Sequence, residues 1–243
     1  MEIAEYENIY KNEKRHFFYV STHQLVISLI NKFRPRKKLK ILDAGCGTGL
    51  LAKKLQEFGT VYGIDISSEA LHFARKRGIK VKKSSIEKLP FLGNSFDVVV
   101  SIDVLTHESI KNDLIPLNEF YRILKPEGIF ILRVSAYNWL QLIHGKHVHM
   151  NHRYERGELF RKLKIAKFSI NKLSFIDSIL FLPMVLRYFW EKITKPIGTK
   201  SAINELNPII NNLLIKALKL ESIMFMKINI PFGIGLVAVA KKS

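Results

Sequence analysis

Short apolar segments alternate with helix-forming segments from residue 39 to residue 134, and no other feature of the chain constrains the fold as strongly. Such alternation is typical of βαβ units, in which successive strands lie parallel and helices cover both faces of the sheet. We therefore predict an α/β fold with a doubly wound, mostly parallel sheet. The predicted strands are 39–43, 61–65, 79–83, 96–102 and 129–134, and the predicted helices are 48–58, 67–77 and 112–124.

A turn with three glycines follows the first predicted strand, in the segment Asp43-Ala-Gly45-Cys-Gly47-Thr-Gly49. Glycines at this place permit a tight turn and let a ligand approach the backbone closely. Asp65 ends the second strand, where its carboxylate can accept hydrogen bonds from both ribose hydroxyls of a nucleoside. These features alone indicate a nucleotide-binding βαβ unit, for which NAD is one candidate.

Two details of the turn favour a ligand other than NAD. The glycines alternate, and the last one lies one residue closer than the dinucleotide fingerprint requires. Asp43 stands directly before the turn, where its carboxylate would repel a pyrophosphate but would suit a cationic amino group. S-adenosylmethionine carries such an amino group and no phosphate. The turn therefore predicts S-adenosylmethionine as the cofactor.

Further motifs follow the turn in a characteristic order. They are Val61–Asp65, Glu87–Phe91, Asn94–Ser101, Asp103–His107 and Ile123–Gly128. Together with the turn, they resemble the class I S-adenosylmethionine-dependent methyltransferases, and within these the methyltransferase type 11-like proteins. The resemblance covers residues 39–135 and implies a Rossmann-like methyltransferase fold, with S-adenosyl-L-homocysteine as the product.

The resemblance also implies how the cofactor is held. Asp43 and the glycines would flank the methionine part, and Asp65 would bind the ribose. Ser85 stands where the family usually has an Asp that contacts the adenine, and Ser101 would border the transferable methyl group. The expected cofactor-binding residues are Asp43, Ala44, Gly45, Cys46, Gly47, Gly49, Asp65, Ile66, Ser85, Ile86, Ser101 and Ile102.

The segments outside this core are predicted to be mostly helical. We expect a helix at 15–33, a helix at 155–163, a strand at 167–173, mainly helices over 174–230 and a last strand at 233–241. Their motifs, among them Arg15–Tyr19 and Arg153-Tyr154, resemble a bacterial and archaeal subgroup whose members often look like envelope-glycan or lipid-linked methyltransferases, most of them without an established substrate. We expect one methyltransferase domain over 1–243: an N-terminal helical cap (1–38), a cofactor-binding core (39–135), a lid and late strand (136–173), a helical insertion before the last strand (174–232) and the final strand (233–243).

Three residues are candidates for catalysis at the methyl group. Methyl transfer is an in-line displacement from a sulfonium, so a general base is required only when the acceptor arrives protonated. His107 follows the fourth strand at the carboxyl edge of the sheet, and His144 and Tyr154 lie in the following loop region. The alternatives are a structural hydrogen bond for His107 and simple packing for Tyr154. No metal site is expected, because the histidines from His144 to His152 match no ligand spacing.

The charge of +18, from 39 Lys and Arg against 21 Asp and Glu, favours a polyanionic partner such as anionic lipid, nucleic acid or an acidic substrate. A lysine-rich surface without a binding role is the alternative. Residues 175–190 are rich in Phe, Leu and Ile, and basic residues follow, so this stretch is a candidate for the membrane interface. The alternative is a buried helix. With neither a signal peptide nor a membrane span predicted, we expect a cytoplasmic protein, peripheral to the inner face of the membrane.

The chain is therefore predicted to methylate oxygen or nitrogen of a small-molecule or lipid- or glycan-linked acceptor by direct in-line transfer. The alternatives are an RNA methyltransferase, motivated by the charge, a quinone-type small-molecule methyltransferase, and a non-catalytic protein that kept the fold. Cys46, the only cysteine, lies in the turn, so a cysteine-nucleophile mechanism on cytosine has no residue to use. Since no RNA-binding module is recognisable either, nucleic acid is a weaker candidate partner.

Overall fold

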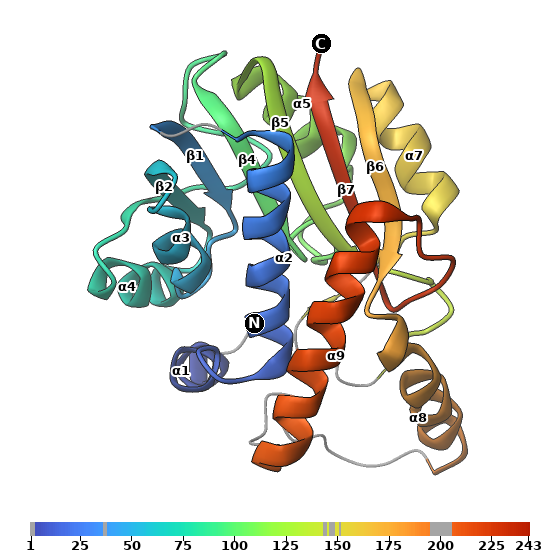
Figure 1. Ribbon diagram of the computed structural model, residues 1–243. Coiled ribbons are helices and arrows are strands. Elements are labelled where there is room, and N and C mark those ends of the chain that lie inside the picture. Colours follow the sequence, from blue (N-terminus) through green and yellow to red (C-terminus); the bar gives the residue numbers. More distant parts are fainter. Residues whose placement is uncertain (1–2, 36–37, 143–144, 146–148, 151, 195–205) are drawn as a thin grey trace.

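The computed structural model describes residues 3–35, 38–142, 145, 149–150, 152–194 and 206–243 (Figure 1). The strands are β1 (Leu39–Ala44), β2 (Gly59–Asp65), β3 (Lys80–Lys83), β4 (Phe96–Ile102), β5 (Leu124–Ser135), β6 (Phe168–Ile176) and β7 (Gly235–Lys242). The helices are α1 (Ile3–Asn12), α2 (Phe17–Phe33), α3 (Leu50–Leu55), α4 (Ser68–Lys76), α5 (Leu114–Ile123), α7 (Arg156–Ile165), α8 (Phe181–Thr194) and α9 (Pro208–Lys227), with a short 3₁₀ helix, η1 (Ser178–Leu180).

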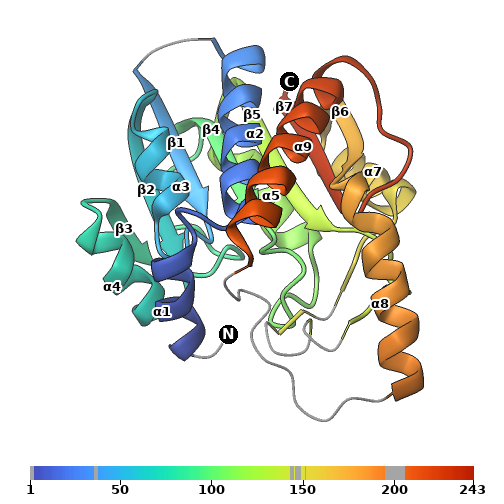
Figure 2. The same ribbon diagram turned by 60° about the horizontal axis from the view of Figure 1, so that its bottom comes forward.

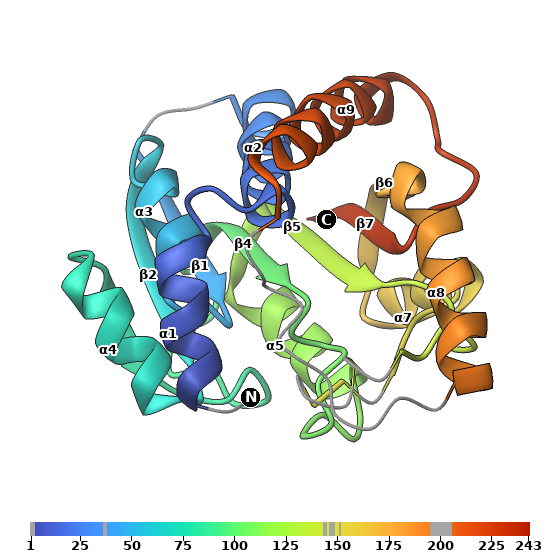
Figure 3. The same cartoon turned by 90° about the horizontal axis from the view of Figure 1, so that it is seen from below.

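The strands form one seven-stranded sheet in the order β3-β2-β1-β4-β5-β7-β6. The first five strands pair in parallel, whereas β7 runs antiparallel to both β5 and β6. The predicted α/β fold with a mostly parallel sheet is therefore confirmed. In Figure 3, α2 and α9 lie on one face of the sheet, and α5 and α7 lie on the other.

The central strand of the sheet shows why the fold could be predicted from the sequence. β4 has the predicted bounds, and its residues Val98, Val99 and Val100 are fully buried between β1 and β5. A strand that is apolar on both faces fits only inside a sheet covered by helices on both sides. Burial of each such side chain stabilises the fold by roughly 1.5–3 kcal/mol.

The carboxyl ends of β1, β2, β4 and β5 point to one end of the sheet, which we call the carboxyl edge. It lies at the lower end of Figure 1, where α1, α8 and the first turns of α9 also lie. Figure 2 brings this end forward. In doubly wound folds, ligands bind outside the carboxyl ends of the strands, so the site is expected here.

Two predicted boundaries are wrong in the second half of the chain. β5 begins at Leu124 and not at 129, so residues 125–128, which separate the predicted helix from the predicted strand, lie within the strand, where the register with β4 shifts and Glu127 has a φ of 64°. An irregularity of this kind bends a strand without ending its pairing. β6 runs to Ile176, which pairs with Gly235, so residues 174–176 are strand and not helix.

The helices differ from expectation mainly at their ends. α1 was not predicted as a separate helix, and α3 is shorter than the expected 48–58. It begins only at Leu50 because Gly49 has a left-handed φ of 81°. Ser67 caps α4, since its hydroxyl accepts a hydrogen bond from the amide of Ala70 at 3.2 Å. Among the described residues, no helix has the length and apolarity needed to cross a bilayer.

Candidate active site

The glycine turn after β1 has the backbone that its sequence predicts. Gly45, Gly47 and Gly49 have φ angles of 83°, 52° and 81°, a region in which residues with a Cβ are strained. A Cβ on Gly45 would collide with the side chain of Val104, and one on Gly49 would lie 2.8 Å from Cβ of Ala74. A Cβ on Gly47, in contrast, would meet no described atom within 4 Å. The turn therefore packs tightly at both ends and is open at Gly47.

Asp43, the carboxylate before the turn, is buried, and its Oδ2 has no hydrogen-bond partner among the described residues. Burial raises the pKa of Asp43 to about 7, with repulsion from Asp65 added and a hydrogen bond from the amide of Ala52 opposing. A buried polar atom without a partner is costly unless a ligand satisfies it. The site thus fits a ligand with a cationic amino group, as the sequence predicted.

Asp65, at the end of β2, holds the other side of the turn. Its Oδ2 accepts a hydrogen bond from the amide of Gly47 at 3.0 Å, and its Oδ1 accepts one from the amide of Ser67 at 2.9 Å. Burial raises its pKa, and these amides oppose that shift. A carboxylate has about four acceptor positions, so both oxygens can still accept hydrogen bonds from a ribose. Tyr6 of α1 is buried nearby, where the charge of Asp65 contributes to its raised pKa.

The other predicted cofactor residues lie close to this pair in the fold. Ala44 and Cys46 are buried at the turn, and burial raises the pKa of the Cys46 thiol. Ile66, next to Asp65, is 50% exposed, so its side chain is available to a ligand. The remaining residues are Ser85, whose hydroxyl accepts from the amide of Glu87, buried Ile86, and Ser101 and Ile102 at the end of β4.

Glu13 is a residue of this region that the sequence did not reveal. It is buried, directly after α1. Its carboxylate accepts a hydrogen bond from the hydroxyl of Thr48 at 2.6 Å and forms an ion pair with Arg77 at 2.5 Å. Arg77 in turn lies over the ring of Tyr10, 4.3 Å from its centroid. These contacts fasten the N-terminal segment to the glycine turn. Glu13 stands in a polar stretch between charged neighbours, which is typical of a surface, so no local signal marks it.

A buried charged cluster lies at the ends of β4 and β5. Arg133 of β5 donates to the carboxylates of Asp103 and Asp177, to the latter at 2.6 Å, and its guanidinium lies over Phe18 of α2. Arg153 is buried beside them and donates to the carbonyl of Ala136 at 3.3 Å. We call Asp103, Arg133, Arg153 and Asp177 the charged cluster. The sequence contains one signal for this cluster: Arg133 is the single charged residue in the apolar segment 129–134, which indicates that a buried acidic partner pairs with it.

Burial and mutual charge set the protonation of the charged cluster. Burial lowers the pKa of Arg153 to about 10, with Arg133 adding to the shift and Asp103 opposing it. Burial also raises the pKa of Asp103, which Arg133 opposes, and Asp103 Oδ1 has no partner among the described atoms. Asp103 and Asp177 have φ angles of 57° and 61°, a left-handed conformation that is strained for a residue with a side chain. The fold holds these carboxylates in place through Arg133.

Of the three residues predicted for catalysis, His107 and Tyr154 lie in the described part of the chain, and each of them makes a structural hydrogen bond. The Ser109 amide donates to Nδ1 of His107 at 3.2 Å, so the neutral ring carries its proton on Nε2. His107 can act as a base only after this bond breaks, although burial lowers its pKa and keeps the ring neutral. Tyr154 is buried and donates to Asp113 at 2.6 Å, which favours the packing role. His144 lies outside the described residues, and those that are described contain no group suited to a metal ion.

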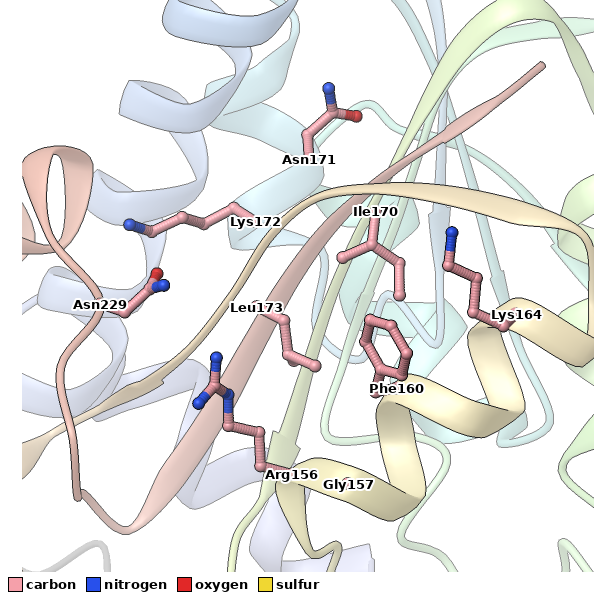
Figure 4. A pocket seen from close by; sticks show the side chains of 9 residues that line it. All are labelled: Arg156, Gly157, Phe160, Lys164, Ile170, Asn171, Lys172, Leu173 and Asn229. Atoms are coloured by element: carbon pink, nitrogen blue, oxygen red, sulfur yellow. The ribbon is translucent and has the colours of Figure 1, made fainter.

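A groove elsewhere on the molecule contains none of these residues (Figure 4). It runs between α7 and the edge strand β6, with Arg156, Phe160, Lys164, Lys172, Leu173 and Asn229 in its wall. Because β6 is separated from β1 by β4, β5 and β7, the groove is distinct from the cofactor turn. We assign the groove no part in methyl transfer.

Comparison with known proteins places this site in a family. A family model described as a methyltransferase domain matches residues 42–132. Uncharacterized protein MJ0638 of Methanocaldococcus jannaschii is 34% identical over 186 residues, which cover 74% of each chain. A ubiquinone biosynthesis O-methyltransferase of Bartonella tribocorum is 32% identical over 112 residues, 43% of this chain and 44% of that protein. The crystal structure of a SAM-dependent methyltransferase from Thermotoga maritima has a TM-score of 0.63 at 19% identity, with 99% of this chain and 96% of that one covered.

The fold and the glycine turn define a Rossmann-like methyltransferase. The chain belongs to the class I S-adenosylmethionine-dependent methyltransferases. Its cofactor is S-adenosyl-L-methionine, which supplies a methyl group on a sulfonium, and S-adenosyl-L-homocysteine is the product.

Proposed function

We propose that this methyltransferase acts on an oxygen or nitrogen atom of an amphiphilic acceptor, such as a lipid- or glycan-linked molecule. The observation that carries the proposal is a continuous series of aromatic rings that begins next to the charged cluster and ends on α8. A polar group of the acceptor would lie at the charged cluster, and its apolar part would lie along the rings.

The ring series starts at Tyr137, directly after β5. Its ring stacks on Phe175 with centroids 5.2 Å apart and lies 5.4 Å from Phe181, the first residue of α8. It also lies 5.8 Å from Trp139, whose ring is 5.6 Å from that of Tyr188 in the middle of α8. Aromatic rings provide apolar contact area at low entropic cost, so this series suits a long apolar group.

The charged cluster can orient the polar end of such an acceptor. Ile102, which would border the methyl group, is in register with Arg133, so the two sites meet at neighbouring strand ends. Asp103 Oδ1 is buried and has no hydrogen-bond partner among the described residues, so a hydroxyl or amine of the acceptor would supply the missing partner. Alignment of the acceptor atom with the sulfonium methyl and exclusion of water are the main tasks of the protein.

For the cofactor, we assign roles to the turn and its neighbours. Asp43 binds the amino group, Asp65 binds the ribose hydroxyls, and Ser101 with Ile102 border the methyl group. Ile66, Ser85 and Ile86 would contact the adenine. The buried, partnerless Oδ2 of Asp43 and the open space at Gly47 support these assignments.

One relative is consistent with an amphiphilic acceptor, although its name matches the quinone-type alternative and not a glycan-linked molecule. The Bartonella tribocorum protein is named for O-methylation in ubiquinone biosynthesis, and ubiquinone is a lipid. The similarity covers less than half of either chain, so it supports the chemical class of the acceptor and not its identity. The RNA alternative rests on the net charge alone.

The test is radiolabelled methyl transfer from S-adenosylmethionine into cell fractions separated into lipid, RNA and water-soluble pools. We expect label in the lipid pool with the native enzyme and less label, at a cofactor concentration below saturation, with the Asp65→Ala variant, which lacks the proposed ribose ligand. Label confined to RNA, or to water-soluble small molecules, would contradict the proposal.

A further inference from the structure

The helix α8 has its polarity reversed relative to an ordinary surface helix. Its one acidic residue, Glu191, faces the protein and is buried. Five large apolar residues instead face outward and are between 55% and 81% exposed: Leu182, Leu186, Phe189, Trp190 and Ile193. Their spacing of four, three, one and three residues places them on one side of the helix. A stripe of this size on a helix marks a surface that meets another apolar phase.

The helix α9 repeats this arrangement. Its one acidic residue, Glu221, is buried and accepts a hydrogen bond from the amide of Ser178 at 2.7 Å. Apolar residues again occupy the outer side, with exposed fractions between 46% and 70%: Ile209, Leu213, Leu220, Ile223 and Met224. The inner side of α9 packs on α2 and β6, so the outer side is left without a partner among the described elements.

The charges on these outer sides have one sign. The exposed charged residues of the two helices are Arg187, Lys192, Lys216, Lys219 and Lys227. Arg187 also binds Glu191 at 2.8 Å, while the lysines add positive charge beside the apolar stripes. A protein partner could match apolar stripes alone, but stripes whose exposed charges, within the described residues of α8 and α9, are all cations complement an anionic lipid surface. Trp190 and Tyr188 are residue types enriched at the level of lipid headgroups.

The position of the stripes relates them to the active site. α8 and the first turns of α9 extend past the carboxyl edge of the sheet, on the side where the cofactor turn lies (Figures 1 and 2). We infer that the outer sides of α8 and α9 form a docking surface for an anionic lipid bilayer. The helices lie in the interface and do not span the membrane, because neither is long and apolar enough to cross it.

Docking in this place would let an acceptor leave the bilayer along the aromatic rings without crossing water. The inference does not depend on the identity of the acceptor, because it rests on the surface of the two helices. Failure of lipid binding and failure of the proposed acceptor class can therefore be told apart.

The test is co-sedimentation of the full-length protein with vesicles of phosphatidylcholine alone and of phosphatidylcholine mixed with phosphatidylglycerol. We expect binding to the mixed vesicles that is at least about tenfold stronger and that weakens as salt is added. The double variant Leu186→Ser/Trp190→Ser should lose about tenfold in binding. Both side chains are largely exposed, so the fold is expected to persist, which circular dichroism would verify.

Leu92→Ser serves as the control, because Leu92 is an apolar residue even more exposed than Leu186 and Trp190, on the loop before β4, away from both helices. It should leave vesicle binding unchanged. A second readout is the fluorescence of Trp190 in a Trp139→Phe background, which should shift to shorter wavelength on mixed vesicles. Equal binding to both vesicle types, or unchanged binding of the double variant, would overturn the inference. So would a dimer that forms without vesicles and is lost in the double variant, since a second copy would then cover the surface.

Discussion

The cofactor side and the proposed acceptor side of this enzyme, which contains the charged cluster, are built in different ways. At the cofactor turn, the key features are the positive φ angles of Gly45, Gly47 and Gly49 and the buried carboxylate of Asp43, whose Oδ2 has no hydrogen-bond partner among the described residues. At the acceptor side, the key features are ion pairs between Arg133, Asp103 and Asp177, which join residues 30 and 44 positions apart. The first side is local in sequence, and the second is assembled by the tertiary fold.

This difference teaches where each kind of site is vulnerable. A local turn is sensitive to a single added methyl group, because its geometry depends on glycine. A buried ionic cluster tolerates no loss of one partner, because the remaining charges stay in a poorly solvated place. The following substitutions separate these two kinds of dependence, in order of the expected effect.

Arg133→Ala should have the largest effect on stability. Its removal leaves Asp103 and Asp177 buried without their cation, and the free energy of unfolding should fall by about 3–5 kcal/mol. Chemical denaturation measures this change. The matched control is Lys241→Ala, which breaks the partly exposed pair with Glu127 and should cost less than about 1 kcal/mol. Equal losses from the two variants would show that the charged cluster has no special structural role.

Gly49→Ala should destabilise the turn by about 2–4 kcal/mol, because a left-handed φ and a contact with Ala74 act together. Gly78→Ala is the matched control, since Gly78 has a φ of 75° but open space around it. The control should lose only about 1 kcal/mol. If thermal or chemical unfolding shows the same loss for both, the tight packing at Gly49 contributes nothing.

Asp65→Ala should weaken S-adenosylmethionine binding by about 1–3 kcal/mol, because its carboxylate would no longer accept hydrogen bonds from the ribose. It also frees the amide of Gly47 that it now binds. Calorimetric titration measures the affinity, and Asp97→Ala, at the opposite end of the sheet, provides the control. Unchanged affinity in Asp65→Ala would show that the Asp65 carboxylate does not bind the ribose hydroxyls.

Tyr154→Phe should have the smallest effect. The lost hydrogen bond to Asp113, which Lys162 still binds, should lower stability by about 1 kcal/mol. Methyl incorporation into the lipid pool should stay within about twofold of the native rate, because the phenol is occupied by a structural bond. A loss of about a hundredfold or more would instead restore Tyr154 as a catalytic acid or base.

The sequence revealed the cofactor side well for a physical reason. Val98 to Val100 must lie inside a sheet, and the turn needs glycine at fixed positions, so each feature is encoded by neighbouring residues. The start of β5 before the bend at Glu127 is not apparent from the sequence, because a strand irregularity and a turn use the same residue types.

The contacts between residues that are distant in sequence, on both sides of the site, could not be predicted from the sequence. Glu13 meets Thr48 and Arg77 only once α1 has docked, and Asp177 meets Arg133 only once β6 has paired with β7. The exposed apolar side of α8 could not be predicted from the sequence either. Its composition was compatible with a buried helix, and only the fold shows which side faces outward.

The central claim is that the buried carboxylate of Asp43 selects the cationic, phosphate-free cofactor. In the cofactor-free protein its pKa is raised to about 7, so it is largely protonated in mild acid, and binding the amino group requires it to ionise. Calorimetric titration with S-adenosylmethionine between about pH 5 and pH 8 tests this most directly. We predict an affinity that rises by up to about tenfold per pH unit below pH 7 and then levels off, with a flat and weaker profile for Asp43→Asn. The same pH dependence in Asp43→Asn would contradict the claim.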